Sequence, residues 1–232
     1  MDNNIKNYRE KELRNYAIAN ILIILYCTKK LAFLQIMGSM TANSFLGLLI
    51  NSGLIGSFIY CYVFIIDSVI SSEWKDFIIY FGKNKRPGNT IFSDIENGKV
   101  KDDRFSKDDA KSFYSNIYCQ VDDKTKPDQE NRKFENKEWY KIYLKYQNET
   151  KVLVLNRDYL LCRDITMMSV SLMIVYIILA LLFTLTINIR LVIFFCFEFV
   201  ICREAAKSKA QRMANTVIAE DLGKNNKSEA GK

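Results

Sequence analysis

The segment GKNKRPGNT, residues 82–90, carries the residue types that bind phosphate. It places Lys83, Lys85 and Arg86 next to a Pro-Gly pair, with Asn89 as a further hydrogen-bond donor. Glycine lets backbone N–H groups turn toward an anion, and the cationic side chains supply opposite charge. We therefore expect a ligand-binding loop here; the alternative is a loop that only touches anionic lipid headgroups.

A second cationic segment is NRDYLLCRD, residues 156–164, in which Arg157 and Arg163 flank a tyrosine. A guanidinium group stacks on nucleobases and forms paired hydrogen bonds to phosphate. Arg157 and Arg163 are therefore candidate ligand-binding residues, together with those of the first loop. These cations suit a charged nucleotide as the ligand.

Four further charges fall within or beside long apolar segments: Lys29, Lys30, Arg190 and Glu198. Ionisable residues in membrane-spanning helices are costly and are commonly functional, so we expect these four to line a pore. For Arg190 the alternative is a turn position from which its side chain reaches the headgroups. For Glu198 the alternative is a buried carboxyl group, held neutral or paired with a lysine of the first apolar segment.

Catalytic and metal-binding chemistry is hard to build from this composition. The 232 residues include no histidine, and the six cysteines show no CxxC spacing. Serine and cysteine nucleophiles therefore lack their usual base, and a cysteine-only zinc site would need four clustered thiols. We find no P-loop, GxGxxG, HExxH or GxSxG motif. We expect a protein that is not an enzyme and that uses no metal or cofactor.

Long uncharged runs indicate that helices in a membrane position these residues. Residues 40–66 and 165–189 contain no ionisable side chain, and a span needs about 20 apolar residues. Residues 15–38 either cross the membrane or lie in its interface; we favour crossing because it makes the number of spans even. Residues 165–202 fit either a hairpin at TLTIN or one continuous helix, and we favour the hairpin.

These segments predict an all-α integral membrane protein with two transmembrane helix pairs that bracket a small, mainly helical cytosolic insert. Clusters of Lys and Arg in all three soluble parts favour cytoplasmic termini in a plasma membrane. The net charge of +7 also suits an anionic lipid surface or a nucleotide partner. We expect an N-terminal cytosolic arm with the first helix pair over 1–71 and the insert over 72–164. The second helix pair follows over 165–202, and a C-terminal cytosolic helix with a disordered tail over 203–232.

Apolar periodicity predicts the helices of the insert. The segment 106–118 resembles a single capped helix with Phe113, Ile117 and Tyr114 inward, followed by a charged linker over 121–133. The segment 134–149 has an apolar stripe at helical spacing made of Trp139, Ile142, Tyr143 and Tyr146. The following segment runs without a break into the third apolar segment, so we expect one helix to join the insert to the membrane.

The C-terminal segment carries a short heptad-like stripe of Ala206, Ala210, Met213 and Val217. Such a stripe fits either a homo-oligomeric bundle or a lone helix that lies on the insert. We leave these two alternatives open.

The whole architecture, with FGKNKRPGNT and NRDYLLCRDI as the supporting segments, resembles the compact membrane effectors of bacterial anti-phage systems. These are the four-helix effectors of cyclic-oligonucleotide (CBASS) systems and the membrane effector of Hailong systems. The resemblance implies a homo-oligomer, with a tetramer favoured, that contacts membrane lipid and forms an ion channel or pore. It also implies control by a nucleotide or short oligonucleotide from a partner nucleotidyltransferase, and depolarisation of the cell. The alternative is a non-conducting membrane anchor or regulatory subunit for a cytosolic partner.

Overall fold

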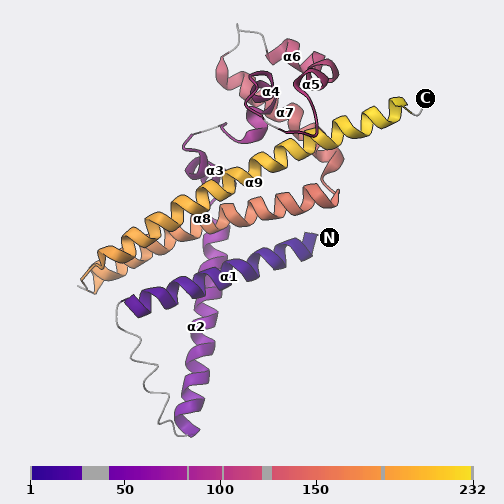
Figure 1. The fold of residues 1–232 in the computed structure, drawn as a ribbon. Helices are drawn as coiled ribbons and strands as arrows, with labels where there is room; N and C mark the ends of the chain where they lie inside the picture. The colour runs from indigo at the N-terminus through magenta and orange to yellow at the C-terminus, as the bar shows by residue number, and fades with distance from the viewer. Residues whose placement is uncertain are drawn as a thin grey trace. The chain divides into compact units, whose positions relative to one another are not determined.

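The computed structural model describes residues 2–27, 42–82, 84–100, 102–121, 127–183 and 186–230. These residues form helices and connecting loops, with no strand among them, which confirms the expected all-α class. The elements, in chain order (Figure 1), are α1 Asp2–Cys27, α2 Ala42–Val69, α3 Ser72–Tyr80, the 3-10 helix η2 Pro87–Asn89, α4 Ile91–Glu96, α5 Lys107–Phe113, α6 Ser115–Val121, α7 Asp128–Tyr146, α8 Thr150–Leu182 and α9 Ile189–Ala230.

The chain divides into two compact units. Unit 1 comprises residues Met1–Lys75 and Leu160–Glu204, and unit 2 comprises Asp76–Tyr159 and Ala205–Lys232. The two long helices α8 and α9 each contribute residues to both units. The expected continuity of the insert with the third apolar segment is therefore confirmed, because α8 runs unbroken from Thr150 to Leu182.

Unit 1 has a core to which four helices contribute. The apolar composition of α1, α2, α8 and α9 drives their packing because burial removes apolar surface from water. The buried side chains of this core are Leu13 and Ala17 from α1, Ile59 and Val63 from α2, Met168 and Leu172 from α8, and Phe195 from α9.

The helices α8 and α9 are antiparallel neighbours in unit 1, where the Cys196 and Met173 sulfur atoms lie 3.9 Å apart. Between them the chain leaves the helix after Leu182 and re-enters it at Ile189, so 165–202 is not one continuous helix. Asn188 caps α9: its Oδ1 accepts from the Arg190 backbone N–H at 3.1 Å. Such caps contribute about 1 kcal/mol to helix stability. The predicted turn at TLTIN is thus where the helix breaks.

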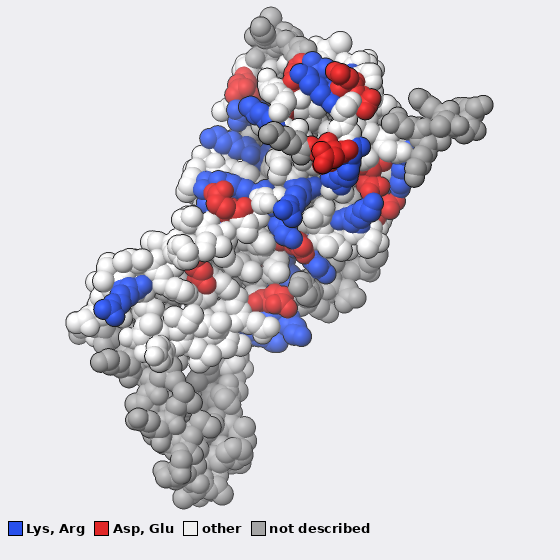
Figure 2. Space-filling model, in the orientation of Figure 1, with Lys and Arg blue, Asp and Glu red and all other residues white. Residues whose placement is uncertain are grey.

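Large apolar side chains of unit 1 also face outward. They occur on all four helices, for example Leu22 on α1, Phe58 on α2, Leu182 on α8 and Phe197 on α9. In Figure 2 the surface beside the turn between α8 and α9 is mostly white. Among the side chains that the structure describes, only those of α8 make a helix long and apolar enough to cross a membrane. The two transmembrane pairs expected from the sequence are therefore not established by the fold.

Unit 2 packs α4–α7 against the C-terminal part of α9. The predicted stripe on α7 is confirmed for Trp139, Ile142 and Tyr146, which are buried, whereas Tyr143 is only half-buried. The Trp139 indole N–H donates to the Ala214 carbonyl of α9 at 3.4 Å. In Figure 2, charged side chains gather over α5 on the outside of this unit.

Two predictions within the insert are wrong. The segment 106–118 is not one helix, because Tyr114 leaves helical geometry (φ −98°, ψ 28°) between α5 and α6. Tyr114 is buried as expected, whereas Phe113 is exposed, Ile117 is half-buried and Tyr118 is buried. The charged segment predicted as a linker is partly helical, since α7 begins at Asp128.

The C-terminal stripe packs against other residues of the same chain. Ala206, Ala210, Met213 and Val217 are all buried in unit 2, which is the second of the two alternatives drawn from the sequence. Helix α9 ends only at Ala230, so most of the segment expected to be a disordered tail is helical.

Candidate functional site

The loop expected to bind phosphate is packed against α7. Pro87, Gly88 and Asn89 are buried, and a Cβ at Gly88 would lie 2.7 Å from the Trp139 Cε3 atom. The Asn89 amide donates to the Arg132 carbonyl at 3.0 Å. Glycine here allows close approach to an indole ring, and Asn89 holds the loop in place. Both residues therefore have a packing role in the contact between this loop and α7.

The cations of this loop differ in their surroundings. Lys83 lies outside the described residues, and Lys85 is exposed. Arg86 forms an ion pair with Asp76, whose other carboxylate oxygen accepts from the Tyr159 hydroxyl at 2.7 Å. An anionic ligand would therefore have to compete with Asp76 for Arg86, and with the Phe81 carbonyl, 3.5 Å from the ammonium, for the exposed Lys85.

The two other candidate ligand residues also have carboxylate partners. Arg157 lies 3.1 Å from Asp158 in unit 2, and Arg163 lies 3.3 Å from Asp164 in unit 1. Partial burial opposes ionisation of Asp158, but hydrogen bonds from Lys209 and Arg157 outweigh it and hold its pKa below the usual range. The six predicted ligand residues are thus not gathered into one described anion site.

The residues expected to line a pore are placed as follows. Lys29 and Lys30 lie outside the described residues, and Arg190 is exposed in the first turn of α9. Glu198 is half-buried and accepts from the Asn20 amide of α1 at 3.2 Å. A described hydrogen-bond partner of Glu198 is therefore an asparagine of the same chain, and the lysines that one alternative names as its partner lie outside the described residues.

A cluster of five charged residues, which sequence reasoning missed, ties α1, α2, α3 and α8 together in unit 1. Lys75 lies 2.6 Å from Asp67 and 3.1 Å from Asp164. Arg9 bridges the same two carboxylates, at 2.9 Å from Asp67 and 3.3 Å from Asp164, and Arg163 completes the cluster. In the sequence these residues appear only as acidic or basic residues near the ends of three apolar segments. Spacing along the chain does not show which acid pairs with which base.

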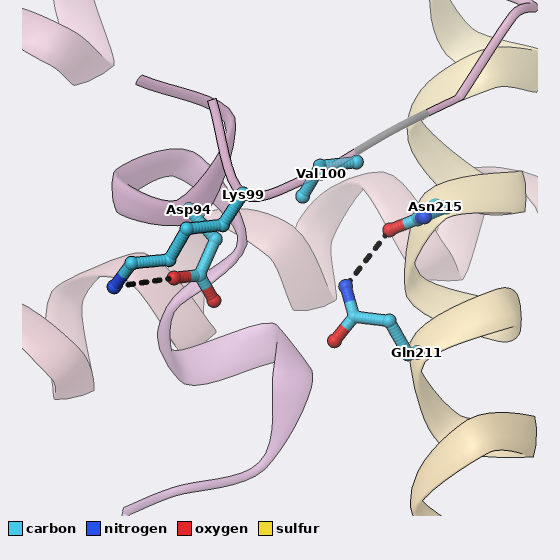
Figure 3. Close-up of a pocket in the computed structure, with 5 residues that line it drawn as sticks. All are labelled: Asp94, Lys99, Val100, Gln211 and Asn215. Atoms are coloured by element: carbon cyan, nitrogen blue, oxygen red, sulfur yellow. Dashed lines mark hydrogen bonds and ion pairs between the residues drawn. The ribbon is translucent and has the colours of Figure 1, made fainter. Parts of the chain in front are cut away.

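Unit 2 contains an open cleft of about 430 Å³ between α4, the loop after it, and α9. Figure 3 shows its lining, in which the Lys99 ammonium lies 3.5 Å from Asp94 and the Gln211 amide donates to Asn215 at 2.9 Å. Val100 adds an apolar wall. The lining offers both hydrogen-bond donors and acceptors and one solvent-exposed cation, which suits a small polar or anionic ligand.

A buried acid fixes one wall of this cleft. The Glu135 carboxylate of α7 accepts from the Phe92 and Ser93 backbone N–H groups, at 3.0 and 3.1 Å, and from the Ser93 hydroxyl. These N–H groups lie in the first turn of α4, where a carboxylate is favoured. Burial raises the pKa of Glu135, although these hydrogen bonds act in the opposite direction. Glu135 therefore positions α4, which carries Asp94.

Among the residues that the structure describes, no cluster of three or more Cys, Asp or Glu is arranged to hold a metal ion. Comparison with known proteins adds no assignment: no family model matches the chain, and no curated protein or solved structure is significantly similar to it.

Proposed function

We propose that this chain is a multi-pass membrane protein whose apolar helices α1, α2, α8 and α9 lie in a bilayer and form, in an oligomer, a ligand-controlled ion channel. The outward-facing apolar side chains of unit 1 support the membrane location, because large exposed apolar patches are rare on soluble monomers. Charges are concentrated in unit 2, which is then the cytosolic insert.

The observation that carries the proposal is the continuity of α8 and α9. Each is one helix that begins or ends in the polar unit 2 and continues through apolar residues of unit 1. A helix is stiff along its axis, so a ligand that shifts its polar end also acts on its apolar end. Gln211 and Asn215 of the cleft belong to α9, as does Glu198. Helix α9 thus links the proposed ligand-binding cleft to an apolar segment of unit 1.

The proposed ligand is a nucleotide or short oligonucleotide bound at the cleft, with Lys99 as the cation for its phosphate. Gln211 and Asn215 would provide amide groups for the edge of a base. The resemblance to anti-phage effectors supports the same ligand class and a role in depolarising an infected cell.

The test is ion flux from liposomes that contain the purified full-length protein. We expect flux to change at least tenfold on addition of an active member of a cyclic-dinucleotide and cyclic-oligonucleotide panel. Gln211→Ala with Asn215→Ala should abolish this response without loss of protein from the liposomes. Gln120→Ala is the matched control, because Gln120 is exposed on α6 outside the cleft. Absence of flux under every ligand condition would refute the proposal.

A second candidate is a non-conducting anchor for a cytosolic partner. It is favoured by the burial of the C-terminal stripe, since Ala206, Ala210, Met213 and Val217 are not available to build an oligomeric bundle. A monomeric mass in detergent, together with co-purification of one stoichiometric soluble partner, would support this candidate against the channel.

A further inference from the structure

Helix α3 and the residue that follows it carry three exposed aromatic side chains. Trp74 and Phe77 are three residues apart on α3, which places them on the same side of the helix. They are 64% and 42% exposed, and Phe81, directly after the helix, is 61% exposed. The opposite side of α3 is covered by protein, since Ile79 is buried. Groups of exposed large apolar side chains mark interaction sites, and we call Trp74, Phe77 and Phe81 the α3 aromatic segment.

The backbone of Phe81 is strained. Its φ is +48°, in the left-handed region that residues with bulky side chains rarely adopt. Glycine would take this conformation without strain, yet the chain has an exposed phenylalanine here. Strained positions of this kind cluster at functional surfaces, because a function repays what folding loses. The exposed ring of Phe81 therefore points to a contact outside this chain.

The start of α3 is fixed at the end of α2. Helix α2 ends at Val69, which is exposed, and α3 begins at Ser72. The ammonium group of Lys75, the residue after Trp74, donates to the Asp67 carboxylate in the last turn of α2 at 2.6 Å. This contact holds Trp74 close to the end of an apolar helix. The inference rests on the membrane location proposed above for α2, whose end then lies at the lipid headgroups, where tryptophan is enriched.

Basic residues near the aromatic segment indicate which surface it fits. Residues 72–86 contain two acidic and four basic residues, the latter being Lys75, Lys83, Lys85 and Arg86. The exposed Lys85 folds back over Gly82, where a Cβ would lie 2.8 Å from its Cε, and its ammonium is 3.5 Å from the Phe81 carbonyl oxygen. A cation is thus held beside the aromatic segment. Aromatic rings next to a cation match the surface of an anionic bilayer, which presents phosphate above apolar chains.

We propose that the α3 aromatic segment docks into the headgroup region of an anionic lipid bilayer, with Lys85 paired to lipid phosphate. Trp74, Phe77 and Phe81 enter the interface, and α3 lies along the membrane surface, whereas α2 crosses the bilayer. The contact anchors the segment that follows α2 in the chain, and it does not require ion conduction.

Tryptophan fluorescence tests the proposal, because the chain has two tryptophans and the other, Trp139, is only 8% exposed. The full-length protein is reconstituted in vesicles of phosphatidylglycerol and phosphatidylcholine, and the Trp74 signal is the difference between wild type and Trp74→Phe. We expect bromines placed near the headgroup to quench this signal about twofold more than bromines near the end of the acyl chain. Iodide on both sides of the membrane should quench it weakly. The Trp139 signal that remains in Trp74→Phe is the internal control.

Two variants separate docking from folding. Lys85→Gln should lower the ratio of lipid-quenched to iodide-quenched Trp74 emission about fivefold in anionic vesicles, which is the effect of one basic residue near such a surface. Lys107→Gln, at an exposed lysine on α5, is the matched control and should keep the wild-type ratio. Phe81→Gly should also lower the ratio, although glycine adopts a φ of +48° without strain.

Three results would overturn the proposal. Iodide quenching of Trp74 as strong as that of a tryptophan amide in solution would place α3 in water. Protection from both iodide and brominated lipid would assign the segment to a protein contact, and stronger quenching by the deep bromines would place α3 in the hydrocarbon core.

Flotation of the protein with the vesicles and ion flux from them are measured in parallel, so that the two proposals can fail separately. Protein that floats while Trp74 stays in water refutes this inference alone. Lipid-quenched Trp74 without flux under any ligand condition refutes the channel and leaves this inference standing. Protein that does not float refutes both.

Discussion

The Lys75 ammonium lies 3.1 Å from the Asp164 carboxylate, and both side chains are almost wholly buried, at 4% and 3% exposed. Around this pair the cluster holds three cations, Arg9, Lys75 and Arg163, against two anions, Asp67 and Asp164. The cluster therefore has an excess of one positive charge. Removing an anion from this cluster should therefore cost more stability than removing a cation.

Asp164→Asn should destabilise the protein far more than Lys75→Met. The first change leaves three cations with one anion, and the second leaves two cations with two anions that still pair. Breaking a buried pair by removing one partner costs about 3–5 kcal/mol. We expect Asp164→Asn to approach that range and Lys75→Met to fall well below it. The measurement is the thermal midpoint of each variant in detergent, followed by tryptophan fluorescence. Equal losses would show that charge balance does not govern this cluster.

Glu135 should make stability depend on pH. Burial raises its folded-state pKa above the usual value, so the native state binds the proton more tightly than the unfolded chain. The resulting stabilisation is fully present below the unfolded pKa and is lost as pH rises through the folded pKa. Glu135→Gln should remove this part of the pH dependence. Glu135→Ala should cost about 1–3 kcal/mol at all pH values, because the first-turn N–H groups of α4 lose their acceptor.

The pH dependence of Glu135 has a control on the same helix. Glu138 pairs with Lys141 on α7, and Glu138→Gln is the matched control because it replaces a carboxyl group of the same helix that does not contact α4 through the Phe92 and Ser93 N–H groups. Thermal midpoints between pH 4 and 8 provide the comparison. A slope that persists in Glu135→Gln would mean that another group titrates there.

The Asp221 carboxylate of α9 is held by two tyrosines of the insert. It accepts from Tyr114 at 2.7 Å and from Tyr146 at 3.0 Å, and it is buried. Hydrogen bonds to a charged group are worth about 1.5–3 kcal/mol. Tyr114→Phe and Tyr146→Phe should therefore each lower stability by roughly that amount, and the double variant should lose more than either. Tyr140→Phe is the control, because Tyr140 is exposed on α7.

Tyr146 adds a pH effect at the alkaline end. Burial, together with the hydrogen bond to Asp221 and the charge of that carboxylate, raises its pKa to about 12 from the usual 10.0. The native state thus holds the phenol proton more tightly, and this stabilisation is lost as pH rises from 10 toward 12. Tyr146→Phe should flatten the fall in thermal midpoint over that range. An unchanged profile in Tyr146→Phe would contradict the role of this hydroxyl.

The sequence predicted helices best where the apolar period was long and uninterrupted. The stripe of Trp139, Ile142 and Tyr146 was found because it keeps one phase through α7. The prediction that Phe113 faces inward was wrong because the helix breaks at Tyr114. The break changes which side chains of the following helix face the core, and the apolar spacing in the sequence does not show it. The turn after Leu182 was found because β-branched and polar residues interrupt an apolar run.

Sites were harder to predict than helices, for a physical reason. A cation is a ligand candidate in the sequence until its carboxylate partner is known, and Arg86 and Asp76 are ten residues apart with a loop between them. Gly88 suggested freed amides, whereas it makes room for Trp139, a contact 51 residues away in the chain. Glu135 was not singled out in the sequence, and its role depends on the start of α4, whose Phe92 N–H group donates to it. The roles of these residues depend on partners that are distant in the sequence, and a local sequence pattern does not identify such partners.

The native cysteines offer a direct test of the membrane location. Cys61 on α2, Cys196 on α9 and Cys119 on α6 are all exposed in the structure, but only Cys119 belongs to the charged unit 2. Thiols react with maleimide as thiolates, which form in water and not in lipid. In membranes opened to the reagent, variants that retain one of these cysteines should label at Cys119 and stay unlabelled at Cys61 and Cys196.

The control for this labelling is the same set of variants denatured in SDS, where all three cysteines should react to completion. Protection of Cys61 and Cys196 in the membrane alone would place their helix faces in lipid, because the structure leaves both thiols uncovered by protein. Equal labelling of all three in native membranes would place the apolar surface of unit 1 in water and refute the proposed spans. Since all three cysteines are exposed residues in the structure, full protection of two of them would have to come from the bilayer or from a partner chain. Labelling in mixed micelles of increasing detergent content distinguishes protection by the bilayer from protection by a partner chain. Detergent that dissociates an oligomer exposes a thiol at a subunit contact, but it still covers a lipid-facing thiol.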